Sequence, residues 1–154
     1  MSRELPSFVA LADLCARFKR EGLIVALGGS GLLHALGLTD SVGDWDLTTD
    51  APWSRVERAL AGLNFEKREP TAEFASEFWC KIEASGASID LMGSFAIRDG
   101  SRVHRVKTIV TGEWRGIPLG SPREWLAVYE LLGRDGKAGT LAAYLKQKPV
   151  HALH

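Results

Sequence analysis

A short apolar strand that runs through a glycine turn into a helix is the feature that most constrains the fold of this chain. Residues 23–27 form a continuous apolar run, which is typical of a buried strand. Three glycines and Ser30 follow, and the apolar stretch 31–36 predicts a short helix with Ser30 as its N-cap. Because helical and strand-like segments alternate along the rest of the chain, the sequence predicts an α/β fold.

Periodic apolar residues predict four more helices, over residues 7–22, 50–63, 121–133 and about 138–146. Ser121 before Pro122, with Glu124 three residues on, is a capping box, and Gly133 marks the end of that helix. Strands are predicted over 43–49, 77–84, 88–95, about 103–110 and about 116–119, with a hairpin turn at 85–87. No linker interrupts this order. We therefore expect a single domain, 1–154, with a core over about 1–112 and a helical C-terminal segment over about 120–148.

The charge balance argues against a nucleic-acid-binding protein. The 154 residues include 19 Lys and Arg and 19 Asp and Glu, so no excess of positive charge attracts a phosphate backbone. No apolar run approaches the roughly 20 residues that span a bilayer, and no leader sequence is expected. Cys15 and Cys80 lack metal-type spacing and are interpreted as reduced core thiols, with a redox pair as the alternative. These features predict a cytoplasmic protein.

The glycine turn has two interpretations. A strand, a glycine turn and a helix start can bind an anion, because backbone N–H groups point outward at the turn. The stretch lacks the lysine of a P-loop, and His34 stands where a dinucleotide fingerprint needs its last glycine. Gly29 and Ser30 are therefore candidate phosphate-binding residues, and an ordinary tight turn capped by Ser30 is the alternative.

Three aspartates in strand-like stretches form the second candidate feature. Asp44 and Asp46 would point to one face of a strand, ~7 Å apart, where their like charges repel unless a cation lies between them. Asp90 interrupts an apolar strand whose neighbours Ile89 and Leu91 are expected to face the core. Three carboxylates can hold two divalent metal ions. Solvated positions at strand ends are the alternative for each aspartate.

Two charged residues near the aspartates, Glu83 and Lys81, each have two interpretations. Glu83 would lie near Asp90 across the predicted hairpin and could join the acidic cluster, although such a glutamate more often faces water. Lys81 is interpreted as an exposed strand lysine, with a contact to phosphate as the alternative.

Together these residues resemble the nucleotidyltransferases of the DNA polymerase β-like superfamily. Their signature is a Gly-Gly or Gly-Ser turn after an apolar residue, then Asp-x-Asp on a strand and a third acid on a later strand. The stretches LGGS, DWDL and SIDLM supply Gly29 and Ser30, Asp44 and Asp46, and Asp90. The order of helices and strands and the stretch 116–134 extend the likeness over most of the chain. Small bacterial members, the aminoglycoside and lincosamide types and toxin–antitoxin partners, are the most similar.

The resemblance implies a mixed, partly antiparallel sheet flanked by helices, with a short helical C-terminal cap. It also implies transfer of a nucleoside monophosphate from an NTP, with ATP expected, to an acceptor hydroxyl. Gly29 and Ser30 would bind the triphosphate. Asp44 and Asp46 would bind the Mg²⁺ that bridges the phosphates, and Asp90 would help to hold a second Mg²⁺ and accept the proton of the hydroxyl.

Two other functions remain open at this stage. One is a non-catalytic interaction module of the toxin–antitoxin type, and the other is a nucleotide-binding regulator without turnover. For an enzyme, a small hydroxylated molecule is the first expectation for the acceptor and a protein side chain the second, while tRNA is disfavoured by the zero net charge. One domain leaves little room for an acceptor pocket, so a homodimer with a site at its interface is a further expectation.

Overall fold

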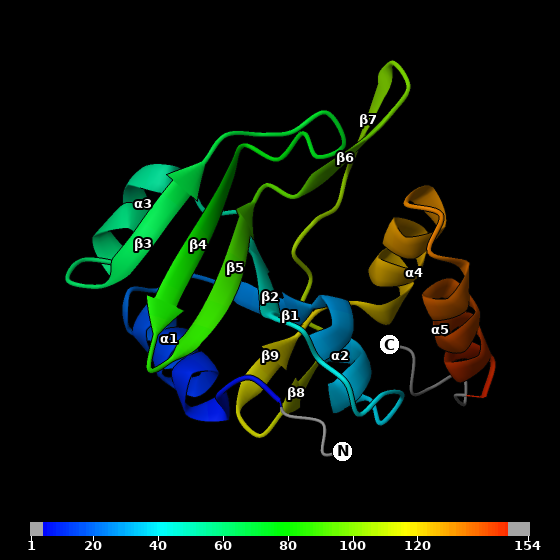
Figure 1. Cartoon of the computed structure of the whole chain (residues 1–154), viewed down its shortest axis with the longest axis horizontal. Coiled ribbons are helices and arrows are strands. Elements are labelled where there is room, and N and C mark those ends of the chain that lie inside the picture. Colours follow the sequence, from blue (N-terminus) through cyan, green and yellow to red (C-terminus); the bar gives the residue numbers. More distant parts are fainter. Residues whose placement is uncertain (1–4, 148–154) are drawn as a thin grey trace.

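The computed structural model describes residues 5–147, which fold around a mixed β-sheet (Figure 1). Its seven strands lie in the order β3 (Asn64–Arg68), β4 (Phe78–Ala84), β5 (Ala87–Gly93), β2 (Trp45–Thr49), β1 (Val25–Gly28), β9 (Ile117–Leu119) and β8 (Gly112–Trp114). Strands β6 (Ala96–Asp99) and β7 (Arg102–Arg105) form a separate hairpin. The pairs β2–β5 and β1–β9 are parallel and the others are antiparallel, so the mixed sheet expected from the resemblance is confirmed.

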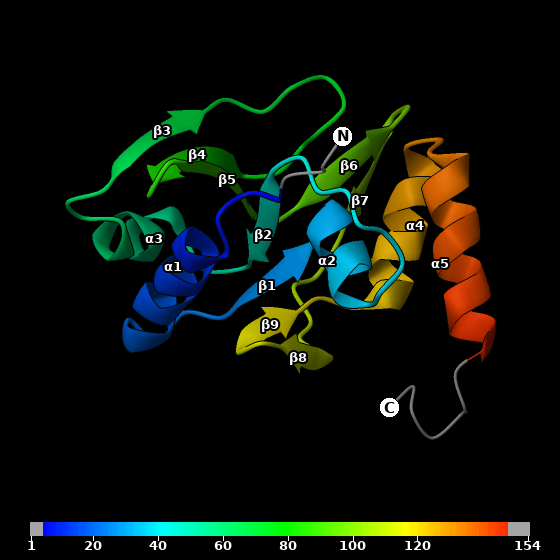
Figure 2. The ribbon, with the colours of Figure 1, turned by 60° about the horizontal axis from the view of Figure 1, so that its bottom comes forward.

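Helices lie on both sides of the sheet (Figures 1 and 2). They are α1 (Phe8–Arg20), α2 (Gly29–Ala35), α3 (Trp53–Ala59), α4 (Pro122–Leu131) and α5 (Asp135–Gln147). Helices α1 and α3 lie together, and the Arg17 guanidinium of α1 donates hydrogen bonds to the carbonyls of Ala59 and Ala61 at the end of α3. Helices α4 and α5 pair beside α2, at a distance from α1 and α3 (Figure 2). None of these helices is long and apolar enough to cross a membrane.

The two faces of the sheet differ in character. Ile89 and Leu91 of β5 are fully buried, as predicted, and alternate with the partly buried Asp90. On β4 the buried Phe78 packs against Trp53 of α3, with ring centroids 5.1 Å apart, so α3 covers the apolar face. Because successive strand residues point to opposite faces, Asp90 points away from this core. The opposite face is the one that can carry a site.

Several local predictions are confirmed. The Ser121 hydroxyl accepts a hydrogen bond from the Glu124 N–H, and Gly133 follows α4 with φ +69°. The β4–β5 hairpin turns through Ser85 and Gly86, both with positive φ, as two-residue hairpin loops require.

The two cysteines are free thiols in the core, also as predicted. Both side chains are buried. Burial raises the pKa of Cys15 to about 12 and is the main cause that raises the pKa of Cys80 to about 11. Both groups are therefore protonated at neutral pH, which makes them unreactive.

Other boundaries are wrong. Ser30 does not cap α2, because that helix begins at Gly29, two residues earlier than predicted, with Gly28 at the N-cap position and no side-chain cap. Within the predicted strand 103–110 only the part up to Arg105 is a strand, and residues 106–111 lie outside the sheet. The last helix begins at Asp135 rather than at 138. Strands β3, β6 and β8 were not predicted, because strands this short contain too few apolar residues to show a clear alternation.

Candidate active site

Two of the three predicted aspartates lie side by side in the sheet. Asp46 of β2 and Asp90 of β5 are register partners on neighbouring parallel strands, so their side chains leave the same face. Asp44 lies before β2 rather than within it, and 48% of its side chain is exposed, against 14% for Asp90. The structure therefore brings Asp46 and Asp90 together and leaves Asp44 at the rim.

Asp90 is held in place by two side chains of the neighbouring strand β4. Its Oδ1 accepts a hydrogen bond from the Trp79 indole N–H at 3.1 Å and lies 3.3 Å from the Lys81 ammonium. Lys81 also lies 3.8 Å from Asp44 Oδ2 and donates to the Ser88 hydroxyl at 3.1 Å. Trp79 and Lys81 both contact Oδ1 of Asp90, and together they orient the carboxylate. Neither of these two contacts involves Oδ2.

Two expectations about charged neighbours, Lys81 and Glu83, can be compared with the structure. Lys81 was expected to be an exposed strand lysine, but it is partly buried and bridges two acids because the hairpin register places it opposite Asp90. Glu83, which could have joined the acids, instead pairs with Ser88 and is exposed to solvent. Glu83 therefore joins neither the adjacent pair Asp46 and Asp90 nor Asp44 at the rim.

Asp46 lies in a strongly perturbed electrostatic environment. Burial raises the pKa of this carboxyl to about 7, and the negative charges of Asp90 and Asp44 add to the effect. The positive charges of Lys137 and Lys81 oppose it. A carboxyl group with these surroundings is stabilised by any added cation.

The glycine turn packs directly against this carboxyl group. Gly29 has φ +59°, a conformation that side chains disfavour, and a Cβ at this position would overlap Asp46 Oδ2. A Cβ at Gly28 would overlap the Trp125 indole of α4. The two glycines thus allow β1, Asp46 and α4 to approach one another, and Ser30 follows them at the edge of the same cavity.

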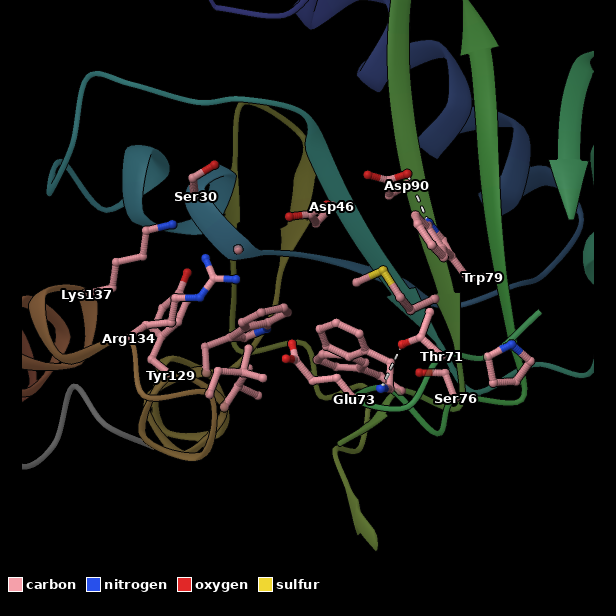
Figure 3. A pocket seen from close by; sticks show the side chains of 18 residues that line it. Ser30, Asp46, Thr71, Glu73, Ser76, Trp79, Asp90, Tyr129, Arg134 and Lys137 are labelled. Carbon is pink, nitrogen blue, oxygen red and sulfur yellow. Dashed lines mark hydrogen bonds between the residues drawn. The ribbon is translucent and has the colours of Figure 1, made fainter. Parts of the chain in front are cut away.

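A cavity of about 520 Å³ joins these elements. Figure 3 shows Tyr129 of α4, Arg134 of the turn after it and Lys137 of α5 on one side of the cavity, facing Ser30 and Asp46. Asp90 and Trp79 lie on the sheet beyond Asp46, and Thr71, Glu73 and Ser76 lie at the other end. The cavity is therefore large enough for a small ligand and presents cations opposite carboxylates.

The carboxylates of this cavity fit a metal ion that binds together with a phosphate ligand. They fit a permanently bound metal ion less well. Within residues 5–147, no group of three or more His, Cys, Asp or Glu side chains is arranged to hold a metal ion. Asp46 and Asp90 are nevertheless adjacent carboxylates, and Asp46 is crowded by negative charge. Magnesium is commonly bound by one or two carboxylates, with phosphate and water oxygens completing the shell. The residues present fit that mode of binding.

Solved structures share this architecture. TM1012 of Thermotoga maritima, a protein assigned to the nucleotidyltransferases, matches with a TM-score of 0.65 and 24% identity over 90% of this chain and 91% of its own. ANT(2″)-Ia, crystallised with adenylyl-2″-tobramycin, matches with a TM-score of 0.59 and 14% identity over 89% of this chain and 88% of its own. The chain has the nucleotidyltransferase fold.

A solution structure of ANT(2″)-Ia, described as an antibiotic-resistance factor, has the same fold, with a TM-score of 0.63 and 13% identity over 94% of this chain and 85% of its own. No family model and no curated protein sequence matches the chain. The nucleotidyltransferase fold that the short motifs suggested is thus supported by the three-dimensional comparison.

Sequence reasoning assigned no role to four residues of this nucleotidyltransferase-fold cavity. They are Trp79, Tyr129, Arg134 and Lys137. A signal existed for Trp79, because a two-residue turn places Lys81 opposite Asp90 and puts Trp79 on the same strand face. No local signal could place Tyr129, Arg134 and Lys137, because their position depends on how α4 and α5 pack.

Proposed function

We propose that this protein is a nucleotidyltransferase that moves a nucleoside monophosphate from an NTP, with ATP as the expected donor, to an acceptor hydroxyl. One observation carries the proposal: the adjacent carboxylates of Asp46 and Asp90 face the cations of Arg134 and Lys137 across one cavity (Figure 3). A metal–triphosphate needs carboxylates for its metal and cations for its phosphates, and this cavity has both. The shared fold adds support.

Asp44, Asp46 and Asp90 are the proposed magnesium ligands, with two ions expected. Bound magnesium neutralises phosphate charge and polarises the phosphoryl oxygens. Asp44 and Asp46 would hold the ion that bridges the phosphates, and Asp90 would contribute to the second. Asp44 lies 3.8 Å from the Lys81 ammonium, so this exposed ion pair would have to open for Asp44 to take part.

The glycine turn is the proposed binding site for the triphosphate on the other side of Asp46. The first N–H groups of a helix have no partner within the helix, so those after Gly28 can donate to phosphate oxygens. Ser30 lines the cavity and does not cap α2, which leaves its hydroxyl able to contact a ligand. Gly29 serves by its lack of a side chain, since a Cβ would displace Asp46.

Asp90 is the proposed proton acceptor for the attacking hydroxyl. The acceptor oxygen would form a bond to the α-phosphorus while the bond from that phosphorus to the α–β bridging oxygen breaks, so that pyrophosphate leaves. The hydroxyl proton would pass to the Asp90 carboxylate. Trp79 and Lys81 both contact Oδ1, which favours Oδ2 as the oxygen that takes the proton.

A small hydroxylated molecule is the proposed acceptor. The end of the cavity beyond Asp90 offers two hydroxyl side chains, Thr71 and Ser76, and one further acid, Glu73 (Figure 3). Polar groups of this kind can orient a ligand that itself carries hydroxyls. We further expect the protein to act in the cytoplasm of a bacterium, as the resemblance implies.

The proposal is tested by incubating the protein with each labelled NTP, Mg²⁺ and candidate hydroxylated acceptors, and by measuring pyrophosphate. Asp90→Asn should lower turnover about 10²–10⁴-fold, because the proton acceptor is lost, and should leave NTP binding largely intact. Glu83→Gln is the matched control, since it removes an exposed carboxylate from the neighbouring strand. If wild-type protein neither binds any NTP at millimolar concentration nor releases pyrophosphate, the proposal fails and a non-catalytic interaction module takes its place.

A further inference from the structure

The hydroxyl group of Tyr129 is a buried donor that has no acceptor. Tyr129 lies on α4 and is 4% exposed, and within the described part of the chain its hydroxyl oxygen makes no hydrogen bond. An unpaired buried hydroxyl destabilises a folded protein, so such groups are uncommon and call for an explanation. The residue also lines the cavity, so its side chain borders the space that a bound ligand would occupy.

Packing explains why this side chain is fixed in position. One helical turn before it, Trp125 packs on the glycine turn at Gly28, where a Cβ would overlap the indole. The Trp125 and Tyr129 rings then lie 5.9 Å apart on the same helix face. The tyrosine ring thereby packs beside Trp125, which itself contacts the glycine turn.

Two cations lie on the same side of the cavity as Tyr129. The Lys137 ammonium lies 5.6 Å from the centroid of the Tyr129 ring, and Arg134 lies on the same side of the cavity (Figure 3). Neither cation can accept a hydrogen bond. Burial, with the Asp46 carboxylate adding to it, raises the pKa of Tyr129 above its usual range, so the hydroxyl keeps its proton at neutral pH. Three donors on one wall call for a ligand with several anionic oxygens.

We propose that Tyr129 is a polyphosphate-binding residue whose hydroxyl donates a hydrogen bond to a phosphate oxygen of the bound NTP, beside Arg134 and Lys137. This inference rests on the proposed function, because it assigns the triphosphate to the wall formed by the C-terminal helices. The hydroxyl is a positioning group, and it takes no part in the proton transfer assigned to Asp90. In the free protein the unpaired hydroxyl lowers the stability of the fold, but it is already in position to bind the ligand.

The test compares Tyr129→Phe with Tyr144→Phe, the same change at the other tyrosine of the chain, which is not among the residues lining the cavity. Binding of ATP and of inorganic tripolyphosphate, each with Mg²⁺, is measured by titration calorimetry, and melting temperatures are measured without ligand. Tyr129→Phe should bind both ligands about tenfold or more weakly, because it loses a hydrogen bond to a charged oxygen. Without ligand it should melt at the same temperature as wild type or higher. Tyr144→Phe should bind as wild type does.

The outcomes separate this inference from the proposed function. Wild-type binding of ATP with unchanged binding by Tyr129→Phe overturns the inference and leaves the proposed function standing. A clearly lower melting temperature for ligand-free Tyr129→Phe shows that the hydroxyl is already paired in the folded protein, and this also overturns it. If wild-type protein binds neither ATP, GTP, CTP or UTP nor tripolyphosphate, both proposals fail.

Discussion

Replacing Asp46 by Asn should stabilise the ligand-free protein at alkaline pH. The folded protein raises the pKa of this carboxyl from 3.8 to about 7, mainly because the group is buried. A raised carboxyl pKa means that ionisation opposes folding, so the penalty is absent below pH 4, grows as the pH rises, and levels off above pH 7. A change in pKa of this size corresponds to a penalty of about 4 kcal/mol as an order of magnitude. Asp46→Asn removes it.

The assay is urea denaturation in the presence of a metal chelator, followed by tryptophan fluorescence at pH 8 and at pH 5. The advantage of Asp46→Asn over wild type should be largest at pH 8 and should shrink by more than half at pH 5, where the wild-type carboxyl is protonated in the folded protein. Asp13→Asn, at an exposed position of α1, is the control and should show no such difference.

Magnesium supplies a second arm of the same experiment. A cation beside Asp46 should offset the penalty in wild-type protein, so millimolar Mg²⁺ with ATP should stabilise wild type at pH 8 and should stabilise Asp46→Asn much less. An advantage of Asp46→Asn that is equal at pH 5 and pH 8 would refute the electrostatic reasoning. It would mean that Asp46 is solvated and that its neighbours do not perturb it.

Two further substitutions test the groups that surround the carboxylates. Trp79→Phe removes the hydrogen bond to Asp90 Oδ1 and should lower the free energy of unfolding by about 1 kcal/mol; in turnover assays it should reduce kcat more than it raises KM for the NTP. Gly29→Ala should destabilise the protein by about 1–2 kcal/mol and weaken ATP binding in calorimetry, because the new Cβ adopts a positive φ and displaces the Asp46 carboxylate. Gly139→Ala, in open space on α5, is its control and should be neutral or stabilising; equal losses at both glycines would contradict the close approach at position 29.

Local patterns carried a large part of this structure. The capped start of α4 at Ser121 and the turn at Ser85 and Gly86 follow from backbone preferences of a few neighbouring residues, and both were predictable. The alternation of Asp90 with Ile89 and Leu91 also showed from the sequence which side of β5 is buried. Such features need no knowledge of distant parts of the chain.

The start of α2 shows where local patterns stop. Ser30 is a residue type that favours N-caps, yet the helix begins at Gly29, where a positive φ and the absence of a Cβ let the turn pack against Asp46. That contact joins the glycine turn to another strand. The preference of serine for the N-cap position is worth only about 1 kcal/mol, so it does not outweigh this tertiary contact. The strand β3 escaped prediction for a related reason, since its polar residues join the sheet only because β4 is already there.

By itself the sequence determined the kinds of chemistry available: three aspartates, a glycine turn and capped helices in an α/β order. Tertiary structure alone decided which of them meet. Asp46 reaches Asp90 because β2 pairs in parallel with β5, and Lys137 faces Asp46 because α4 and α5 pack beside the glycine turn. Pairing of this kind is chosen by burial of the whole sheet rather than by the preferences of adjacent residues, so no short stretch of the chain encodes it.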